Sequence, residues 1–227
     1  MVAQTLVLCS GGLDSVVLVA LEAQTAEVTP AYIAVGLAWE TAERAALDAA
    51  LDALMKTRPF SGGVRPPVVL SFDMRDVYPS SHWAIRGIPP GYDTPDEDVY
   101  IDGRNVVLLA KGAVYAARVG IGRIALGPLA GNPFPDATPR FFSAMAAALS
   151  LGLDRPIEIA VPLVSKRKAE VVKLGLELGV PLRQTLSCMN PGEGGRHCGG
   201  CSKCRERHDA FVEAGVADPT DYVIHRP

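Results

Sequence analysis

Four of the five cysteines in this chain lie in one short segment near its C-terminus. Cys188 is followed ten residues later by Cys198, and Cys201 and Cys204 then continue the spacing as CxxCxxC. Two-residue spacings let thiolates converge on one ion, and the two glycines after Cys198 permit a tight turn. We therefore expect a closed, structural Zn²⁺ site with four sulfur ligands; an iron–sulfur cluster is the alternative.

Other residues near the cluster could also bind a metal. His197 and His208 are alternative ligands, although four cysteines already fill a tetrahedron. Unligated thiols are a further alternative. Cys9, the fifth cysteine, lies in an apolar run, where we expect a small buried residue and no catalytic role.

A second segment with chemical potential is the SGGLDS loop, from Ser10 to Ser15. Its glycines let the backbone turn sharply toward a ligand, and a helix that follows would offer unpaired N–H groups and a positive dipole end. Phosphates suit such a site, the serine hydroxyls can add hydrogen bonds, and Asp14 could hold the turn or lie near Mg²⁺. No lysine follows the glycines, so this is not the loop of P-loop NTPases. A plain turn with capping residues is the alternative.

The elements that must position these residues alternate between strand and helix. We expect strands at Thr5–Cys9, Ala31–Val35, Val68–Phe72, Arg123–Gly127 and 157–163, and helices at 16–23, Glu40–Met55, Asn105–Val119, Pro139–Leu151 and Lys166–Leu178. This alternation predicts a parallel sheet covered by helices on both faces, with ligands at the carboxyl ends of its strands. The long proline-containing segment from Asp73 to about Arg104 is a candidate lid or substrate wall.

Length and composition favour an enzyme of small molecules. A chain of 227 residues with 48% hydrophobic content can form one domain, or one domain with an appendage. The net charge of -3 provides no basic field for nucleic acid or an anionic membrane. We find no targeting signal and no apolar run near the roughly 18 residues of a spanning helix, so we expect a cytoplasmic protein. A cysteine cluster also suits a reducing compartment.

Several segments together resemble a known enzyme family. SGGLDS is similar to the PP-loop of the N-type ATP pyrophosphatases, which adenylate a carbonyl or carboxylate and release pyrophosphate. Combined with the cysteine cluster, the chain resembles the 7-cyano-7-deazaguanine synthase family. The other matching segments are GRNVVLLAKGAVYA from Gly103, FPDATPRFF from Phe134, KAEVVKLGLELGVPL from Lys168, and TLSCMNPGEGGRHCGGCSKCRERHDAFVEAG ending at Gly215.

The resemblance implies a fold and a domain organisation. The fold would be α/β with a parallel, Rossmann-like sheet, as in the PP-loop ATP pyrophosphatases and the adenine nucleotide alpha hydrolases. Residues 1–227 would form a single ATP-binding domain, in which residues 188–227 are a C-terminal zinc-binding helical element. The resemblance also suggests a homodimer.

The resemblance further implies a two-stage reaction. ATP adenylates the carboxylate of 7-carboxy-7-deazaguanine, ammonia displaces AMP to give an amide, and a second activation dehydrates the amide to the nitrile used in queuosine and archaeosine biosynthesis. Lys168 matches the lysine of the family's SKAEIV motif and would neutralise the α-phosphate; a solvated charge at a helix start is the alternative. We expect Lys168, Asp14 and Ser15 to be catalytic and ATP to be used with Mg²⁺. The expected ATP-binding residues are Ser10, Gly11, Gly12, Leu13, Asp14, Ser15, Arg104 and Asn105.

Two segments depart from the family pattern. The family has a YGQRH-like string after its second strand, whereas this chain reads VGLAWE at 35–40. In place of YPDCRPEF it reads FPDATPRF, so that Ala137 and Thr138 replace a Cys-Arg pair and Arg140 replaces a glutamate. Because buried polar contacts discriminate strongly between substrates, these changes bear on the acceptor more than on the activation chemistry.

Trp39, Phe134 and Asp136 are our candidates for a modified acceptor pocket. The two rings would offer an aromatic face to a planar base, and the carboxylate would meet its amidine-like edge. The alternatives are core packing for the two rings and, for Asp136, a cap on the helix that starts at Pro139.

Two other functions remain open. One is a relative that adenylates and amidates a different carboxylate. The other is a tRNA-modifying enzyme, because the segment RHCGGCSKCRERH is locally basic. No basic extension accompanies that segment, so we expect no stable binding to nucleic acid or membrane. The resemblance implies a deazapurine carboxylate and ammonia as partners.

Overall fold

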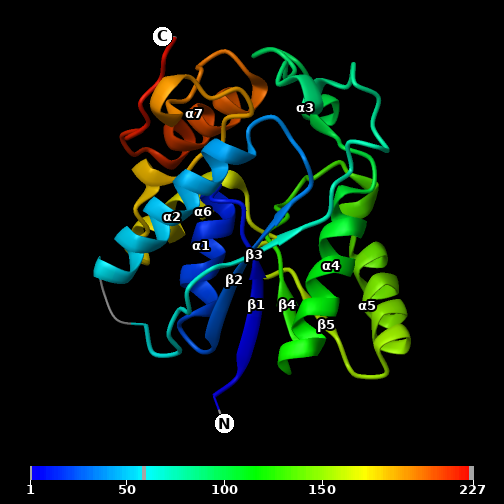
Figure 1. Ribbon diagram of the computed structural model, residues 1–227. Helices are drawn as coiled ribbons and strands as arrows, with labels where there is room; N and C mark the ends of the chain where they lie inside the picture. Colours follow the sequence, from blue (N-terminus) through cyan, green and yellow to red (C-terminus); the bar gives the residue numbers. More distant parts are fainter. Residues whose placement is uncertain (1, 58–59, 225–227) are drawn as a thin grey trace.

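The computed structural model describes residues 2–57 and 60–224, and a five-stranded parallel sheet runs through its middle (Figure 1). The strands are β1 (Gln4–Leu8), β2 (Glu27–Ala34), β3 (Val68–Ser71), β4 (Arg123–Ala125) and β5 (Glu158–Ala160). Their order is β3-β2-β1-β4-β5, and every neighbouring pair is parallel. The expected α/β, Rossmann-like fold is confirmed, and each strand lies within a few residues of its predicted position.

Helices cover the sheet on both faces. They are α1 (Leu13–Glu22), α2 (Glu40–Thr57), α3 (Trp83–Arg86), α4 (Arg104–Val119), α5 (Pro139–Leu153), α6 (Lys168–Glu177) and α7 (Ser202–Ala214). Short 3₁₀ turns are η1 (Asp96–Val99), η2 (Pro135–Ala137), η3 (Leu182–Gln184) and η4 (Glu193–Gly195). Helices α1, α2 and α6 lie on one side of the sheet, α4 and α5 on the other, and α7 and α3 lie beyond the carboxyl ends of the strands (Figure 1).

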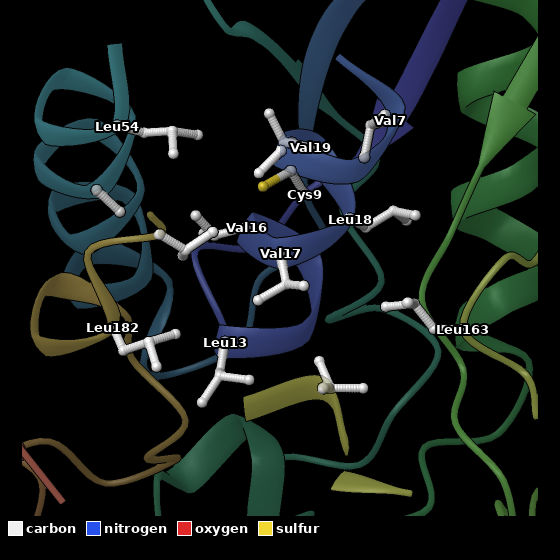
Figure 2. Close-up of a cluster of buried hydrophobic side chains, with 14 of the residues drawn as sticks. Val7, Cys9, Leu13, Val16, Val17, Leu18, Val19, Leu54, Leu163 and Leu182 are labelled. Carbon is white, nitrogen blue, oxygen red and sulfur yellow. The ribbon is translucent and has the colours of Figure 1, made fainter. Parts of the chain in front are cut away.

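The larger part of the core surrounds α1. Val16, Val17, Leu18 and Val19 are all fully buried, because α1 packs between the sheet and the helices α2 and α6 (Figure 2). This position explains why the helix reads as a nearly continuous apolar run. Each such side chain contributes about 1.5–3 kcal/mol when it leaves water, so α1 is fixed firmly behind the loop that precedes it.

The opposite face has a smaller core between α4, α5 and the sheet. Leu109, Ala113 and Ala116 of α4 are fully buried there, and Phe142 of α5 joins them. Helix α4 begins immediately after the long segment 73–103. Its first turn therefore lies at the same end of the sheet as the SGGLDS loop.

The long segment from 73 to 103 is a packed wall. The Tyr78 hydroxyl donates to the Asp102 carbonyl at 2.6 Å, and Val99 and Ile101 are buried. In α3, the ring of Trp83 stacks on Trp39 with centroids 5.6 Å apart and planes only 7° apart. Of the two interpretations made from the sequence, this packing favours a substrate wall. Among the helices in the described part of the chain, none combines the length and apolarity needed to cross a membrane.

Gly11 sets how closely the SGGLDS loop approaches α2. Its φ is +83°, and a Cβ there would lie 2.8 Å from the Glu43 carbonyl oxygen and 2.8 Å from the Leu47 nitrogen. Gly63 has a similar φ of +87° but no heavy atom within 4 Å of the equivalent position. Substitutions at these two glycines therefore distinguish the cost of a left-handed backbone conformation from the cost of a steric clash.

We predict that Gly63→Ala costs only the left-handed backbone penalty, about 1–2 kcal/mol. Gly11→Ala should cost about 1–3 kcal/mol more, because α2 must move to admit the methyl group. Urea unfolding of the two variants without added nucleotide measures this difference. Equal losses of unfolding free energy would show that the loop is not held against α2 as described.

Candidate functional site

A cleft opens at the carboxyl ends of the strands, where the strand order reverses between β1 and β4. It consists of two adjoining cavities of about 270 and 280 Å³. We call the first the strand-side cavity, because the ends of β1 and β2 line it, and the second the α7-side cavity. Residues that line both are Ser10, Gly12, Asp14, Glu43, Arg104, Gly127, Asn132 and Phe134. The expected location of the ligand site thus coincides with a cleft.

The SGGLDS loop forms a tight turn at the floor of the cleft. The Ser15 hydroxyl donates to the Gly12 carbonyl at 2.9 Å and accepts from the Ser10 N–H at 3.3 Å. The Ser10 hydroxyl accepts from the Gly12 N–H at 3.3 Å. Both serines therefore hold the turn that leads into α1, whose first-turn N–H groups have no partner within the helix itself.

Two members of the predicted nucleotide-binding set lie away from the opening. Gly11 packs against the backbone of α2 and does not line either cavity. The Leu13 side chain is buried in the core, although the residue borders the α7-side cavity. Their contribution to a ligand would come from the backbone.

Lys168 and Asp14 meet beside this loop, although 154 residues separate them. The Lys168 Nζ lies 2.5 Å from Asp14 Oδ2 and 3.6 Å from Glu206 Oε1. Burial disfavours the ammonium, but the two carboxylates outweigh it and raise the pKa of Lys168. Lys168 is the first residue of α6, but its side chain is only 15% exposed. The alternative interpretation as a solvated charge at a helix start is therefore wrong.

Glu206 extends this group of charges toward α7. Its Oε2 lies 2.7 Å from the Lys203 Nζ. Burial would raise the pKa of Glu206, but Lys168 and Lys203 outweigh it and lower the pKa to about 2. Sequence reasoning missed both residues, because Lys203, between two cysteines, and Glu206, just after the last one, read as the polar surface of a metal-bound turn.

The strand-side cavity has an apolar wall and an aromatic pair. Val99, Ile101 and Leu108 line it, and the rings of Tyr100 and Phe134 lie with centroids 5.2 Å apart. A flat heteroaromatic ring suits such surroundings. Phe134 therefore lines a cavity, and its contact with an acceptor ring stays a prediction.

Glu43 is a buried carboxyl at the junction of the two cavities. Burial raises its pKa, while the Arg104 guanidinium opposes that rise. The Tyr32 hydroxyl donates to Glu43 Oε2 at 3.0 Å. Arg104, which we predicted to bind ATP, lines both cavities, and its Nε is buried without a protein hydrogen-bond partner. Glu43 was not predicted, because a glutamate on an alanine-rich helix reads as solvated.

Asp136 and Asn105 bind each other. The Asn105 N–H donates to Asp136 Oδ2 at 2.9 Å, and Asn105 Nδ2 donates to the Asp136 carbonyl at 3.0 Å. Burial raises the pKa of Asp136, and these donors oppose the rise. The expected alternative cap on the helix at Pro139 is wrong: Thr138 caps α5 by accepting from the Phe141 N–H at 3.1 Å, and Asp136 caps α4.

Trp39 is only 4% exposed and stacks on Trp83, yet it borders the α7-side cavity together with Phe134. Asp136 instead borders the strand-side cavity. The three residues predicted as one acceptor pocket therefore surround the same cleft but lie in different parts of it.

The four cysteines converge as their spacing predicted. All four sulfurs lie within 4.8 Å of one another, with Cys188–Cys201, Cys198–Cys204 and Cys201–Cys204 distances of 4.0, 3.8 and 3.5 Å. Sulfurs bound tetrahedrally to zinc at about 2.3 Å lie about 3.8 Å apart. Backbone N–H groups also donate to two of the sulfurs, which favours thiolates. The cluster can therefore hold a metal ion such as zinc.

The neighbouring histidines are not part of this cluster. Burial and the Arg207 guanidinium lower the pKa of His197 to about 3, and its Nε2 accepts from the Ser187 N–H at 3.0 Å. Arg207 itself is fully buried and donates to the Thr185 hydroxyl and the Leu182 carbonyl at 2.9 and 2.7 Å. No sequence signal identified Arg207 as the side chain that ties α7 to the chain before the cluster.

We predict that Asp136→Ala lowers the free energy of unfolding by about 0.5–2 kcal/mol, because the first turn of α4 loses an acceptor. Asp136→Asn should retain most of the stability, since an amide oxygen can still accept. Thermal unfolding of both variants without ligand is the measurement. Unchanged stability in Asp136→Ala would mean that the carboxylate is free to serve a ligand instead.

Comparison with known proteins places the chain in a family. It matches the family described as "Queuosine biosynthesis protein QueC" over residues 4–215. A 7-cyano-7-deazaguanine synthase of Methanothrix thermoacetophila is 34% identical over 95% of this chain and 96% of its own length. Another of that name, from Syntrophotalea carbinolica, is 32% identical over 96% of each chain. One from Thermoplasma acidophilum is 40% identical over 54% of this chain and 53% of its own. The chain therefore belongs to the QueC family of enzymes.

Proposed function

We propose that this enzyme converts 7-carboxy-7-deazaguanine and ammonia to 7-cyano-7-deazaguanine with ATP. The main support is its similarity, over nearly the full length of both chains, to enzymes named 7-cyano-7-deazaguanine synthase. The cleft adds physical support, because an anion-binding loop, a buried lysine and an aromatic pair all border it.

Each activation would join a substrate oxygen to the α-phosphorus of ATP. A carboxylate oxygen attacks that phosphorus and pyrophosphate leaves; ammonia then attacks the acyl carbon and AMP leaves with the carboxylate oxygen. A second ATP adenylates the amide oxygen, with loss of pyrophosphate and one N–H proton, and departure of AMP with loss of the second N–H proton gives the nitrile. This route balances, because each of the two oxygens departs as part of an AMP.

The residues of the chain would stabilise the charge that develops on phosphorus. Lys168 lies beside the loop and can exchange Asp14 for a phosphate oxygen. The first-turn N–H groups of α1 would bind the departing pyrophosphate. Arg104, whose Nε has no protein partner, would donate a hydrogen bond to an oxygen of ATP or of the acceptor. Asp14 Oδ1 is buried without a protein partner, which fits a Mg²⁺ ligand; Mg²⁺ would neutralise phosphate charge there.

The departures from the family pattern mostly avoid the cleft. Ala137 is buried in the core beside α4, Thr138 caps α5 and Arg140 is exposed, and none of the three borders either cavity. In VGLAWE, the Glu40 carboxylate accepts from the Val35 N–H at 2.7 Å. Two of the departures border the cleft: Trp39, and Phe134 in place of the family's tyrosine, which keeps the aromatic ring and lacks only the hydroxyl. We therefore favour an unchanged acceptor over a different carboxylate.

We predict that ATP is split to AMP and pyrophosphate during nitrile formation. Lys168→Ala should slow turnover by about 10²-fold or more, because it removes the cation beside the α-phosphate. Product chromatography and mass spectrometry of the acid, amide and nitrile are the measurements, with Lys173→Ala on the exposed side of α6 as control. Formation of ADP alone, or no product from this acid, would contradict the reaction.

We further propose that the cysteine cluster holds one structural zinc ion per chain. Cys201→Ser should lose the metal and lower the melting temperature by well over the roughly 2–4 °C that one kcal/mol represents at this size. Cys9→Ser, which changes a buried cysteine outside the cluster, should keep the bound metal. Elemental analysis reporting stoichiometric iron in the wild type, or metal retained in Cys201→Ser, would rule the assignment out.

A further inference from the structure

Four charged side chains alternate in sign along the α7-side cavity. Asp14 contacts Lys168 at 2.5 Å, Lys168 lies 3.6 Å from Glu206, and Glu206 contacts Lys203 at 2.7 Å. All four border that cavity. They come from three helices, α1, α6 and α7, so the row is assembled by tertiary packing.

Lys203 differs from an ordinary helix-surface lysine. An exposed i,i+3 pair stabilises a helix by only about 0.2–0.5 kcal/mol and needs no burial. Lys203 and Glu206 instead have only 26% and 25% of their side chains exposed, and they face a cleft that already contains Lys168. A second ammonium in this position serves a bound anion better than it serves the helix.

The cysteine cluster determines where Lys203 lies. Lys203 stands between Cys201 and Cys204, and α7 begins at Ser202 directly after a cysteine of the cluster. Arg205 holds the same turn against the wall segment, because its guanidinium donates to the carbonyls of Tyr92 and Thr94 at 2.7 and 2.9 Å. The backbone of Lys203 is therefore fixed on both sides.

We propose that Lys203 is a second anion-binding cation of the active site, which Glu206 holds in place until an anionic substrate group replaces it. The cysteine cluster, once metal-bound, positions this lysine as well as stabilising the fold. The proposal rests on the proposed use of ATP and a carboxylate. Two groups offer the required chemistry, a phosphate oxygen of ATP and the carboxylate of the acceptor.

The test is ligand binding by calorimetry to the metal-replete full-length protein. Lys203→Gln should lower the affinity for either inorganic pyrophosphate or 7-carboxy-7-deazaguanine by about tenfold, the usual loss for one charge-assisted contact. The ligand affected identifies the anion. 7-Deazaguanine without the carboxylate should bind equally well to both proteins.

Two further variants separate charge from structure. Lys203→Arg should restore most of the lost affinity, and Lys173→Gln, which makes the same charge change on an exposed part of α6, should bind like the wild type. Metal content and melting temperature of Lys203→Gln should match the wild type. Chelation of the metal should lower the affinity of the wild type for the ligand that Lys203 binds, and should lower the affinity of Lys203→Gln for that ligand by a smaller factor.

Each outcome decides between the claims. If Lys203→Gln binds both anions like a wild type that does use ATP, the role of Lys203 is wrong and the proposed reaction stands. If the wild type binds neither pyrophosphate, ATP nor the acid, both are wrong. Equal losses on chelation in the wild type and Lys203→Gln would refute the positioning role of the cluster. If the metal-free protein unfolds, the binding results for Lys203→Gln and Lys203→Arg decide alone.

Discussion

The reversal of strand order between β1 and β4 is the constraint on which the site depends. The chain leaves β1 toward one edge of the sheet and β4 toward the other, so the connections that follow these adjacent strands diverge and leave room for a ligand. Because α1 is buried on nearly all sides, its N-terminal turn is held rigidly at this opening. The Asp14–Lys168 contact then fastens α6 to the same point. Charged and polar groups from distant parts of the sequence thus meet at one place.

The C-terminal element completes this opening from outside the sheet. Its cysteines bring residues 188–204 together, Arg207 ties α7 to the preceding chain, and Arg205 holds the wall segment. Glu206 then contacts Lys168 across the α6–α7 interface. A metal bound by these cysteines would do more than add its binding free energy to folding, since the helix that follows the cluster borders the cleft.

The sequence predicted much of the fold because its signals were local. Short apolar runs marked the strands, three of them followed by glycine, and cysteine spacing alone located the cluster. The contacts that shape the site are non-local, and periodicity carries no record of them. Lys168 was identified only through its family resemblance, and the buried state of Glu43 could not be inferred from an alanine-rich helix. For Asp136, the alternative to an acceptor contact was a cap on the helix next to it in sequence, whereas its carboxylate caps α4, which begins 32 residues earlier in the chain.

The central claim is that both oxygens of the acceptor leave attached to the α-phosphorus of ATP. Turnover of 7-carboxy-7-deazaguanine labelled with ¹⁸O in both carboxylate positions tests this directly. Mass spectrometry should find one ¹⁸O in each of the two AMP molecules formed per nitrile, and none in pyrophosphate. Label in inorganic phosphate or in water, with unlabelled AMP, would contradict adenylation and the roles assigned to Lys168 and the SGGLDS loop.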